Sequence, residues 1–362
     1  MDVTKTPTLS RRKRVVFALV AMALAFGLSV TALLGADIFL HRKFQTSAGV
    51  NVWGYRGPTL GRKKPGELRI AFLGGSTAFG YGVTADQAIP AQLEKKLNAR
   101  LPTGVSRVSV ANLGYNNEGA YSFTFTLDDY QYLDYDIVCL YEGYNDMSGD
   151  WRKPNTSVFR HESPVFKLTG YLPIFPIAFR EKASALRNGG DLDAHYREMR
   201  GEAPKTVFHA GLANRTAAGA LEATAAIGES LERQLGKVTK EPPRAIVGAA
   251  SSGCKNPWGE YCTSMFKAVD HALAMGKRVL VITQPNLGGS LRERHIDQQK
   301  TMAGALALRY RGNPRVGYAN AGAVVDIEDP LVGYDHMHLT APGSAVVAEF
   351  LVEPVRALIQ DR

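Results

Sequence analysis

The stretch "RIAFLGGSTAFGYGV", Arg69 to Val83, contains an apolar run that stops at two glycines and a serine. A short apolar run that ends in glycine is typical of a buried strand followed by a tight turn. Three interpretations of this turn are open at first. It is a plain turn, a phosphate-binding loop, or a place where a nucleophile is held at the tip of a strand.

Three known glycine-containing motifs do not fit this stretch. A P-loop needs a lysine after its last glycine, but Tyr81 follows Gly80. A dinucleotide-binding turn needs its glycines directly after the strand and an acidic residue further on, and this spacing provides neither. The elbow of α/β-hydrolases needs a glycine at position 78, which is Ala78. Ser76 therefore remains as a serine presented at a strand-to-helix turn.

The rest of the chain predicts a doubly wound α/β fold. Segments 85–101 and 261–276 have apolar residues at helical spacing, and Pro90 is expected in the first turn of the former. Strands that alternate with helices favour a parallel sheet with helices on both faces. The five expected strands are "LRIAFLG" (68–74), "VSRVSVANLG" (105–114), "YDIVCLYEG" (135–143), "RVLVITQP" (278–285) and "RVGYAN" (315–320).

Residues 147–245 interrupt this alternation. Aromatic residues, prolines and basic residues are followed there by a helical-looking stretch, so we expect an insertion beside the carboxyl edge of the sheet. It would serve as a lid or as an amphipathic segment on a membrane, or it would be a helical hairpin that only covers the core. We expect a basic tip and an anchor over 1–41, a linker over 42–66, and the α/β domain over 67–362.

The N-terminal region predicts a membrane anchor. Four basic residues (11–14) precede 22 residues without a charge, 15–36. A helix needs about 20 apolar residues to cross the bilayer core. Basic residues favour the cytoplasmic side, so we expect a single pass through the inner (plasma) membrane, with the N-terminus cytoplasmic and the remaining chain extracytoplasmic. The alternative is a cleaved signal peptide, whose apolar region is usually only about 7–15 residues, and the position before Asp37 is a poor cleavage site.

The basic balance of the chain does not indicate a nucleic-acid partner. The net charge is +9, but the basic residues are scattered apart from 11–14 and 62–64, and no zinc finger or RNA-binding motif is present. No cofactor motif is found, so no cofactor is expected. The remaining partners we expect are an ester substrate and the lipid bilayer around residues 15–36.

The three cysteines allow different roles. Cys139 lies in an apolar run and is expected in the core. Cys254 and Cys262 flank a seven-residue loop and could form a disulfide in an oxidising compartment, or they could be two unrelated free thiols. Their spacing, with no other cysteine or clustered histidine nearby, is a poor match to a zinc site.

Two further residues lie at the ends of predicted strands, where ligands of open α/β sheets bind. Gly114 follows the second strand, and a glycine there lets a backbone N–H approach a reacting oxygen. Asn145 follows the third strand, and its side chain offers a neutral donor suited to an oxyanion. Taken singly, each is also explained as an ordinary turn residue.

The C-terminal region supplies a base and a carboxylate. Asp335 and His338 are three residues apart, just before the expected last helix, so the carboxylate can reach the imidazole. A serine nucleophile needs such a base and a group that orients it. His336 and His338 could instead form a metal pair with Asp335 as the third ligand. No other histidine or acidic cluster completes that site, so no metal is expected.

These blocks together resemble the SGNH/GDSL hydrolase family, and "FLGGST" looks like its membrane-anchored bacterial members. The resemblance runs from about residue 69 to 357. It implies a flavodoxin-like three-layer α/β/α fold with about five parallel strands. It also implies a nucleophile, two oxyanion donors, an orienting acid and a base at Ser76, Gly114, Asn145, Asp335 and His338. One position departs from the family pattern: the first block usually reads Gly-Asp-Ser, and Gly75 replaces the aspartate.

The resemblance implies a serine esterase, anchored to the membrane and acting outside the cytoplasm. The expected substrates are short acyl esters, with O-acetyl groups on cell-envelope polysaccharide preferred because of the location. Two alternatives remain open. An O-acyltransferase would use the same triad to acylate polysaccharide, and a non-catalytic protein of polysaccharide assembly would not use it at all.

Overall fold

The computed structural model describes residues 10–46, 49–147, 160, 163–190, 209–239, 254 and 257–360. The chain divides into two units. One comprises Met1–His41 and Ile174–Ala226, and the other comprises Arg42–Pro173 and Ile227–Arg362. The predicted insertion at 147–245 therefore contributes to both units, and its parts at 148–159, 161–162, 191–208 and 240–245 lie outside the described residues.

The second unit is built on a five-stranded sheet in the order β2-β1-β3-β4-β5, in which every pair is parallel. This order is the flavodoxin-like one, and it places the change of winding direction between β1 and β3. The register of the central strands aligns Ala71 with Ala111 on one side and with Val138 on the other. The strands are β1 (Glu67–Gly74), β2 (Arg107–Asn112), β3 (Ile137–Tyr141), β4 (Arg278–Thr283) and β5 (Val316–Asn320).

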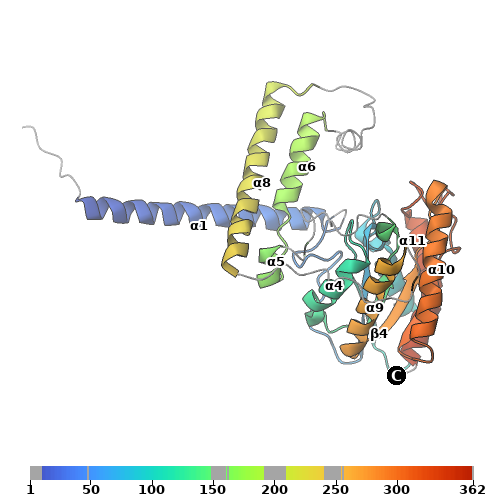
Figure 1. The fold of residues 1–362 in the computed structure, drawn as a ribbon. Coiled ribbons are helices and arrows are strands. Elements are labelled where there is room, and N and C mark those ends of the chain that lie inside the picture. Colours follow the sequence, from blue (N-terminus) through green and yellow to red (C-terminus); the bar gives the residue numbers. More distant parts are fainter. Residues whose placement is uncertain are drawn as a thin grey trace, which may run out of the picture. The chain divides into compact units, whose positions relative to one another are not determined.

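Helices cover both faces of the sheet (Figure 1). On one face, α3 (Ile89–Ala99) packs against α11 (Ala341–Gln360). On the other face lie α4 (Phe123–Asp129), α9 (Gly259–Ala274) and α10 (Arg292–Arg309). This is the arrangement that right-handed crossovers produce when the chain winds outward from β1 in both directions. The predicted three-layer α/β/α fold with five parallel strands is confirmed.

The core forms where alternate residues of the strands face the helices. Phe72 of β1 and Tyr141 of β3 lie side by side with ring centroids 5.7 Å apart, beneath α3 and α11. Burial of such side chains is the main favourable term in folding. Cys139 is a free cysteine fully buried in this cluster, as predicted. Other members are Leu68, Ile70, Ile89, Leu93, Leu97, Val108, Ile137, Leu280, Ile282, Val347, Leu351 and Val355.

The predicted helices are confirmed, with shorter bounds. Residues 85–101 form a 3₁₀ turn, η1 (Ala85–Gln87), followed by α3, and Pro90 lies in the first turn of α3. Because proline lacks an N–H that a first turn does not use, it fits there without breaking the helix. The helix predicted at 261–276 is α9, which ends at Ala274.

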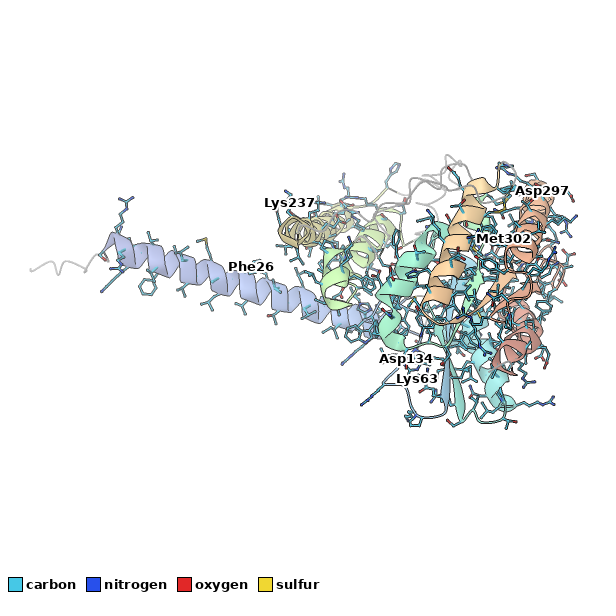
Figure 2. All side chains as sticks on the ribbon, turned by 60° about the horizontal axis from the view of Figure 1, so that its bottom comes forward. Phe26, Lys63, Asp134, Lys237, Asp297 and Met302 are labelled. Carbon is cyan, nitrogen blue, oxygen red and sulfur yellow. A yellow bond between two sulfur atoms is a disulfide. The ribbon has the colours of Figure 1, made fainter. Side chains whose placement is uncertain are left out.

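Residues of the predicted linker pack on the sheet. Tyr55 and Arg56 are buried, and the Arg56 N–H donates to the carbonyl of Asn112 at the end of β2. At the opposite, amino ends of the strands, Lys63 forms an ion pair with Asp136 at 2.9 Å and approaches Asp134 at 3.7 Å (Figure 2). Residues 49–66 therefore contribute contacts at both ends of the sheet.

The first unit contains α1 (Arg11–Phe44) as far as His41, α6 (Phe175–Arg187) and the start of α8 (Leu212–Thr239). By length and composition, α1 is the one described helix that could cross a membrane, and its apolar side chains, such as Phe26, are exposed (Figure 2). Asp37 is fully buried, and its Oδ1 accepts hydrogen bonds from the N–H groups of Ile174 and Phe175 at 2.8 and 2.6 Å. A carboxylate of α1 thus caps the N-terminus of α6.

Candidate active site

The turn after β1 presents Ser76 at the carboxyl edge of the sheet. Ser76 begins a four-residue helix, α2 (Ser76–Phe79), which ends at Gly80 in the left-handed conformation, with φ of 87°. The buried neighbour Thr77 accepts a hydrogen bond from Gln284 Nε2 at 2.7 Å, just beyond β4. This turn therefore rests on the sheet, and the side chain of Ser76 is left at its edge.

The structure brings Ser76, His338 and Asp335 into one hydrogen-bonded chain. Ser76 Oγ lies 2.8 Å from His338 Nε2, and His338 Nδ1 lies 2.6 Å from Asp335 Oδ2. A carboxylate can only accept, so Nδ1 carries a proton and Nε2 is left to accept the hydroxyl proton of Ser76. This is the arrangement that a serine nucleophile requires.

The three-residue spacing between Asp335 and His338 has a second effect. Asp335 Oδ1 accepts from the backbone N–H groups of His338 at 2.7 Å and Met337 at 3.2 Å, while Oδ2 meets the imidazole. Burial acts to raise the pKa of the Asp335 carboxyl, but hydrogen bonds from the side chain and backbone of His338 outweigh it and hold this pKa below its ordinary value. Asp335 is therefore a carboxylate at neutral pH.

Asn145 lies next to the turn that carries Ser76. It belongs to the 3₁₀ turn η4 (Tyr144–Asp146) after β3, and its Nδ2 donates to the carbonyl of Glu118 at 2.9 Å. A methyl group placed on Gly75 would come too close to Asn145 Nδ2 and would lie 2.8 Å from Glu142 Oε2. The space that a side chain at position 75 would need is thus filled by Asn145 and Glu142, which gives the Gly75 departure a physical reason.

Gly114 packs directly against α2. A Cβ at this position would lie 2.6 Å from the backbone nitrogen of Phe79, so a residue with a side chain would push α2 away. The N–H of Gly114 donates to Asn112 Oδ1 at 3.1 Å. Gly114 thus lies beside the Ser76 helix with its N–H engaged by a side chain, and an oxyanion would have to compete with that amide oxygen.

Two buried acids behind Asn145 were not predicted from the sequence. Glu142 Oε1 accepts from the N–H groups of Gly143 at 2.9 Å and Asn145 at 3.2 Å. Burial, reinforced by the charge of Asp146, raises the pKa of Glu142 to about 8. Burial likewise raises the pKa of Asp146, whose Oδ2 accepts from the Ala120 N–H at 3.0 Å. The visible signal was an acid at the end of the apolar run "IVCLYE", 137–142.

Arg160 was also missed, because its contacts are distant in sequence. It is fully buried, and it donates to the carbonyls of Gly54 at 2.9 Å and Leu113 at 2.6 Å and forms an ion pair with Glu118 at 3.4 Å. Glu118 is the residue whose carbonyl holds Asn145. A single guanidinium thus supports the loop that positions the amide of Asn145.

His336 turns away from this group. Its Nδ1 lies 2.7 Å from Glu328 Oε2, while His338 faces Ser76 and Asp335. The two histidines therefore have different partners. Among the residues that the structure describes, no group of three or more His, Cys, Asp and Glu side chains is placed to hold a metal ion.

The rings of Tyr81 and Tyr334 both lie close to the ring of His338. The ring centroid of His338 is 5.0 Å from that of Tyr81 and 5.8 Å from that of Tyr334, which stacks on it at 19°. Tyr334 Oη donates to the carbonyl of Tyr81 at 2.9 Å. These two tyrosines were not predicted as site residues, because no motif or spacing in the sequence connects them with Ser76 or His338.

Among solved structures, this chain is similar to several esterases and lipases. One is an acetyl xylan esterase from Geobacillus stearothermophilus, at 11% identity over 80% of this chain and 94% of that chain, with a TM-score of 0.40. A Clostridium thermocellum family 3 carbohydrate esterase is 11% identical over 81% and 98%, with a TM-score of 0.36. The lipase Lip_vut3 from a goat rumen metagenome is 12% identical over 80% and 97%, with a TM-score of 0.37.

No protein-family model matches this sequence, and no curated protein matches it. The structural similarities have low identity and TM-scores below 0.5. They do not establish a shared activity.

Proposed function

We propose that this chain is a serine esterase of the SGNH type. The observation that carries the proposal is the continuous chain of hydrogen bonds from Ser76 Oγ through the His338 ring to the Asp335 carboxylate, with separations of 2.8 and 2.6 Å. A serine hydroxyl is a weak nucleophile until an adjacent base takes its proton, and the base is effective when a third group orients it.

The reaction would proceed through an acyl-enzyme. Ser76 Oγ attacks the ester carbonyl carbon as His338 Nε2 takes the hydroxyl proton, and Asp335 stabilises the imidazolium that forms. His338 then gives this proton to the leaving alkoxide as the carbon–oxygen bond breaks, and the acyl group stays on Ser76. Water, deprotonated by His338, then attacks the acyl carbon, and His338 returns this proton to Ser76 Oγ as the bond between Oγ and the acyl carbon breaks and the carboxylic acid leaves.

Asn145 is the oxyanion donor that we assign first. Its amide lies against Gly75, the residue before the nucleophile, and is held there by the Glu118 carbonyl. The N–H groups of Ser76 and Gly114 would complete the oxyanion site, the latter by leaving Asn112 Oδ1 when charge develops on the substrate oxygen. Donors fixed in advance stabilise the transition state more than the ester itself.

We further propose that the enzyme is anchored by α1 and acts outside the cytoplasm. The disulfide between Cys254 and Cys262 supports this location, because disulfides persist in oxidising compartments. Short acyl esters, such as O-acetyl groups on cell-envelope polysaccharide, are the substrates that such a location would supply.

The proposal is tested with the full chain in detergent. Ser76→Ala should abolish hydrolysis of phenyl acetate, followed as released acetate, and labelling by a fluorophosphonate. The matched control is Ser106→Ala, because Ser106 lies at the amino end of the sheet, where its Oγ donates to Pro65. Turnover or labelling that survives in the Ser76 variant would refute the assignment.

A further inference from the structure

The aromatic residues beside His338 form an exposed surface. Tyr81 and Tyr334 are 52% and 46% exposed, whereas Tyr141 and Tyr144, at the end of β3, are buried. A tyrosine gains stability by burying its ring, and rings that stay half in water next to a reactive group are typical of ligand-binding surfaces. The two exposed rings are also tied together, since Tyr334 Oη donates to the Tyr81 carbonyl.

The proton transfer by the triad determines which half of a bound ester lies next to these two rings. In the proposed function, on which this inference rests, His338 Nε2 delivers its proton to the leaving alkoxide. The alcohol half of the ester must therefore lie within hydrogen-bonding distance of Nε2. Because the rings of Tyr81 and Tyr334 lie 5.0 and 5.8 Å from the ring that carries Nε2, we place the alcohol half of the ester beside them.

The electrostatics of this surface favour a neutral alcohol. Burial, together with the charge of Asp335, raises the pKa of Tyr334, so its phenol stays protonated. The carboxylate of Asp335, the residue that follows Tyr334, is 40% exposed at this surface, and this anion disfavours an alcohol half that carries a phosphate or carboxylate. A saturated ring with hydroxyl groups at its edge and C–H groups on its face fits aromatic side chains that also carry polar tips.

We propose that Tyr81 and Tyr334 form a subsite for the alcohol half of the substrate, and that this half is the pyranose ring of a neutral saccharide. The enzyme would then select its substrate by the sugar that bears the ester, and less by the length of the acyl chain. The alternative is that the two rings only hold His338 in place. The two roles, sugar binding and support of His338, can be distinguished by experiment. Loss of support for His338 would slow the hydrolysis of every ester by the same factor.

The experiment compares three unactivated esters with the full chain in detergent. Methyl 6-O-acetyl-glucopyranoside and ethyl acetate differ in the alcohol half, while ethyl acetate and ethyl butyrate differ in the acyl half. For Tyr81→Leu we expect the ratio of kcat/KM between sugar acetate and ethyl acetate to fall about tenfold, equivalent to about 1.4 kcal/mol. This fall should come mainly from KM, and the ratio between the two ethyl esters should change less than twofold.

Tyr132→Leu is the matched control, since Tyr132 is 57% exposed but lies beside Tyr130. It should leave both ratios as in the wild type, and Tyr81→Phe should restore most of the sugar preference. Free methyl glucopyranoside should also inhibit hydrolysis of ethyl acetate competitively by the unaltered protein. This second measurement does not depend on the folding of a variant.

Several outcomes would overturn the inference. They are an unchanged sugar ratio in the Tyr81 variant, an equal loss for all three esters, a changed acyl ratio, or no inhibition by the free glycoside. If the wild type hydrolyses ethyl acetate in a Ser76-dependent way and one of these occurs, only the saccharide subsite fails. If no ester is hydrolysed in a Ser76-dependent way, the proposed function fails as well.

Discussion

Replacing Gly75 by alanine tests how the Ser76 turn is joined to Asn145. The added methyl group would lie 2.8 Å from Glu142 Oε2 and 3.0 Å from the Glu118 carbonyl oxygen, where ordinary contact begins at 3.4 Å. Asn145 Nδ2 is closer to this position than either oxygen. The end of the Asn145 side chain is the part that can move most easily, so we expect it to swing away and lose its hydrogen bond to Glu118.

The magnitude follows from the distances. Glu142 Oε2 would have to retreat by 0.6 Å (3.4 minus 2.8), and Asn145 Nδ2 by more than that. A displacement of about 1 Å at a catalytic group can cost about 10²-fold in rate. Loss of one oxyanion donor costs about 10²–10³ in kcat. We therefore expect Gly75→Ala to lower kcat about 10²-fold while the protein remains folded.

The assay is a double-mutant cycle on the hydrolysis of ethyl acetate. Asn145→Ala alone should lower kcat about 10²–10³-fold. The combined variant should be no slower than Asn145→Ala alone, because both changes remove the same donor and their effects do not add. Gly304→Ala is the control, since a Cβ there meets nothing within 4 Å.

Two results would refute this reasoning. If Gly75→Ala keeps kcat within about threefold of the wild type, the amide of Asn145 either does not move or does not matter. If the combined variant is slower by the product of the two single effects, Gly75 acts on the reaction by a route other than Asn145.

Three further predictions concern the triad, the buried acids and the disulfide. Asp335→Asn should lower kcat for ethyl acetate by about 10³–10⁴-fold without unfolding the protein, because an amide cannot hold the required tautomer of His338. A loss of less than tenfold would contradict this prediction. The pKa values of Glu142 and Asp146 are raised by burial, so the folded state binds protons more tightly than the unfolded one, and the free energy of unfolding should fall as pH rises from about 5 to 8. Glu142→Gln should make this fall shallower by up to about 1.4 kcal/mol per pH unit in urea titrations, and an unchanged slope would show that Glu142 does not titrate there. Cys262→Ser opens the loop to Cys254 and should lower the free energy of unfolding by about 2–3 kcal/mol in non-reducing buffer, with no difference from the wild type under reducing conditions.

Most of the fold was predictable because its signals are local. Strands β1 to β4 are buried apart from residues at their amino ends, so they stand out as mainly apolar runs in the sequence, whereas the edge strand β5 is partly exposed. The turn at Ser76 and the pair Asp335 and His338 are equally local, and the fold brings them together because all lie at the carboxyl edge of one sheet. Parallel strands place their ends together whatever the chain does between them.

The remaining parts of the candidate site depend on contacts that no local pattern encodes. In the sequence, Glu142 is simply a polar residue at the end of a predicted strand. Only the structure shows that it accepts from the Asn145 N–H and lies against Gly75. Arg160 reaches carbonyls at 54 and 113, which are far from it in the sequence. From its position after the second strand, Gly114 was expected to offer a free N–H to an oxyanion. In the structure this N–H donates to Asn112 Oδ1.

The cap that Asp37 forms on α6 bears on proteolytic processing. A signal peptidase acting after Ala36 would turn Asp37 into a new N-terminal residue and place an α-ammonium group where its carboxylate is fully buried. The same cut would interrupt α1 in the middle of its helical hydrogen bonds, since this helix continues to Phe44. Processing at that bond would thus require α6 to give up its cap, and N-terminal sequencing of the mature protein should find the chain still continuous through Ala36.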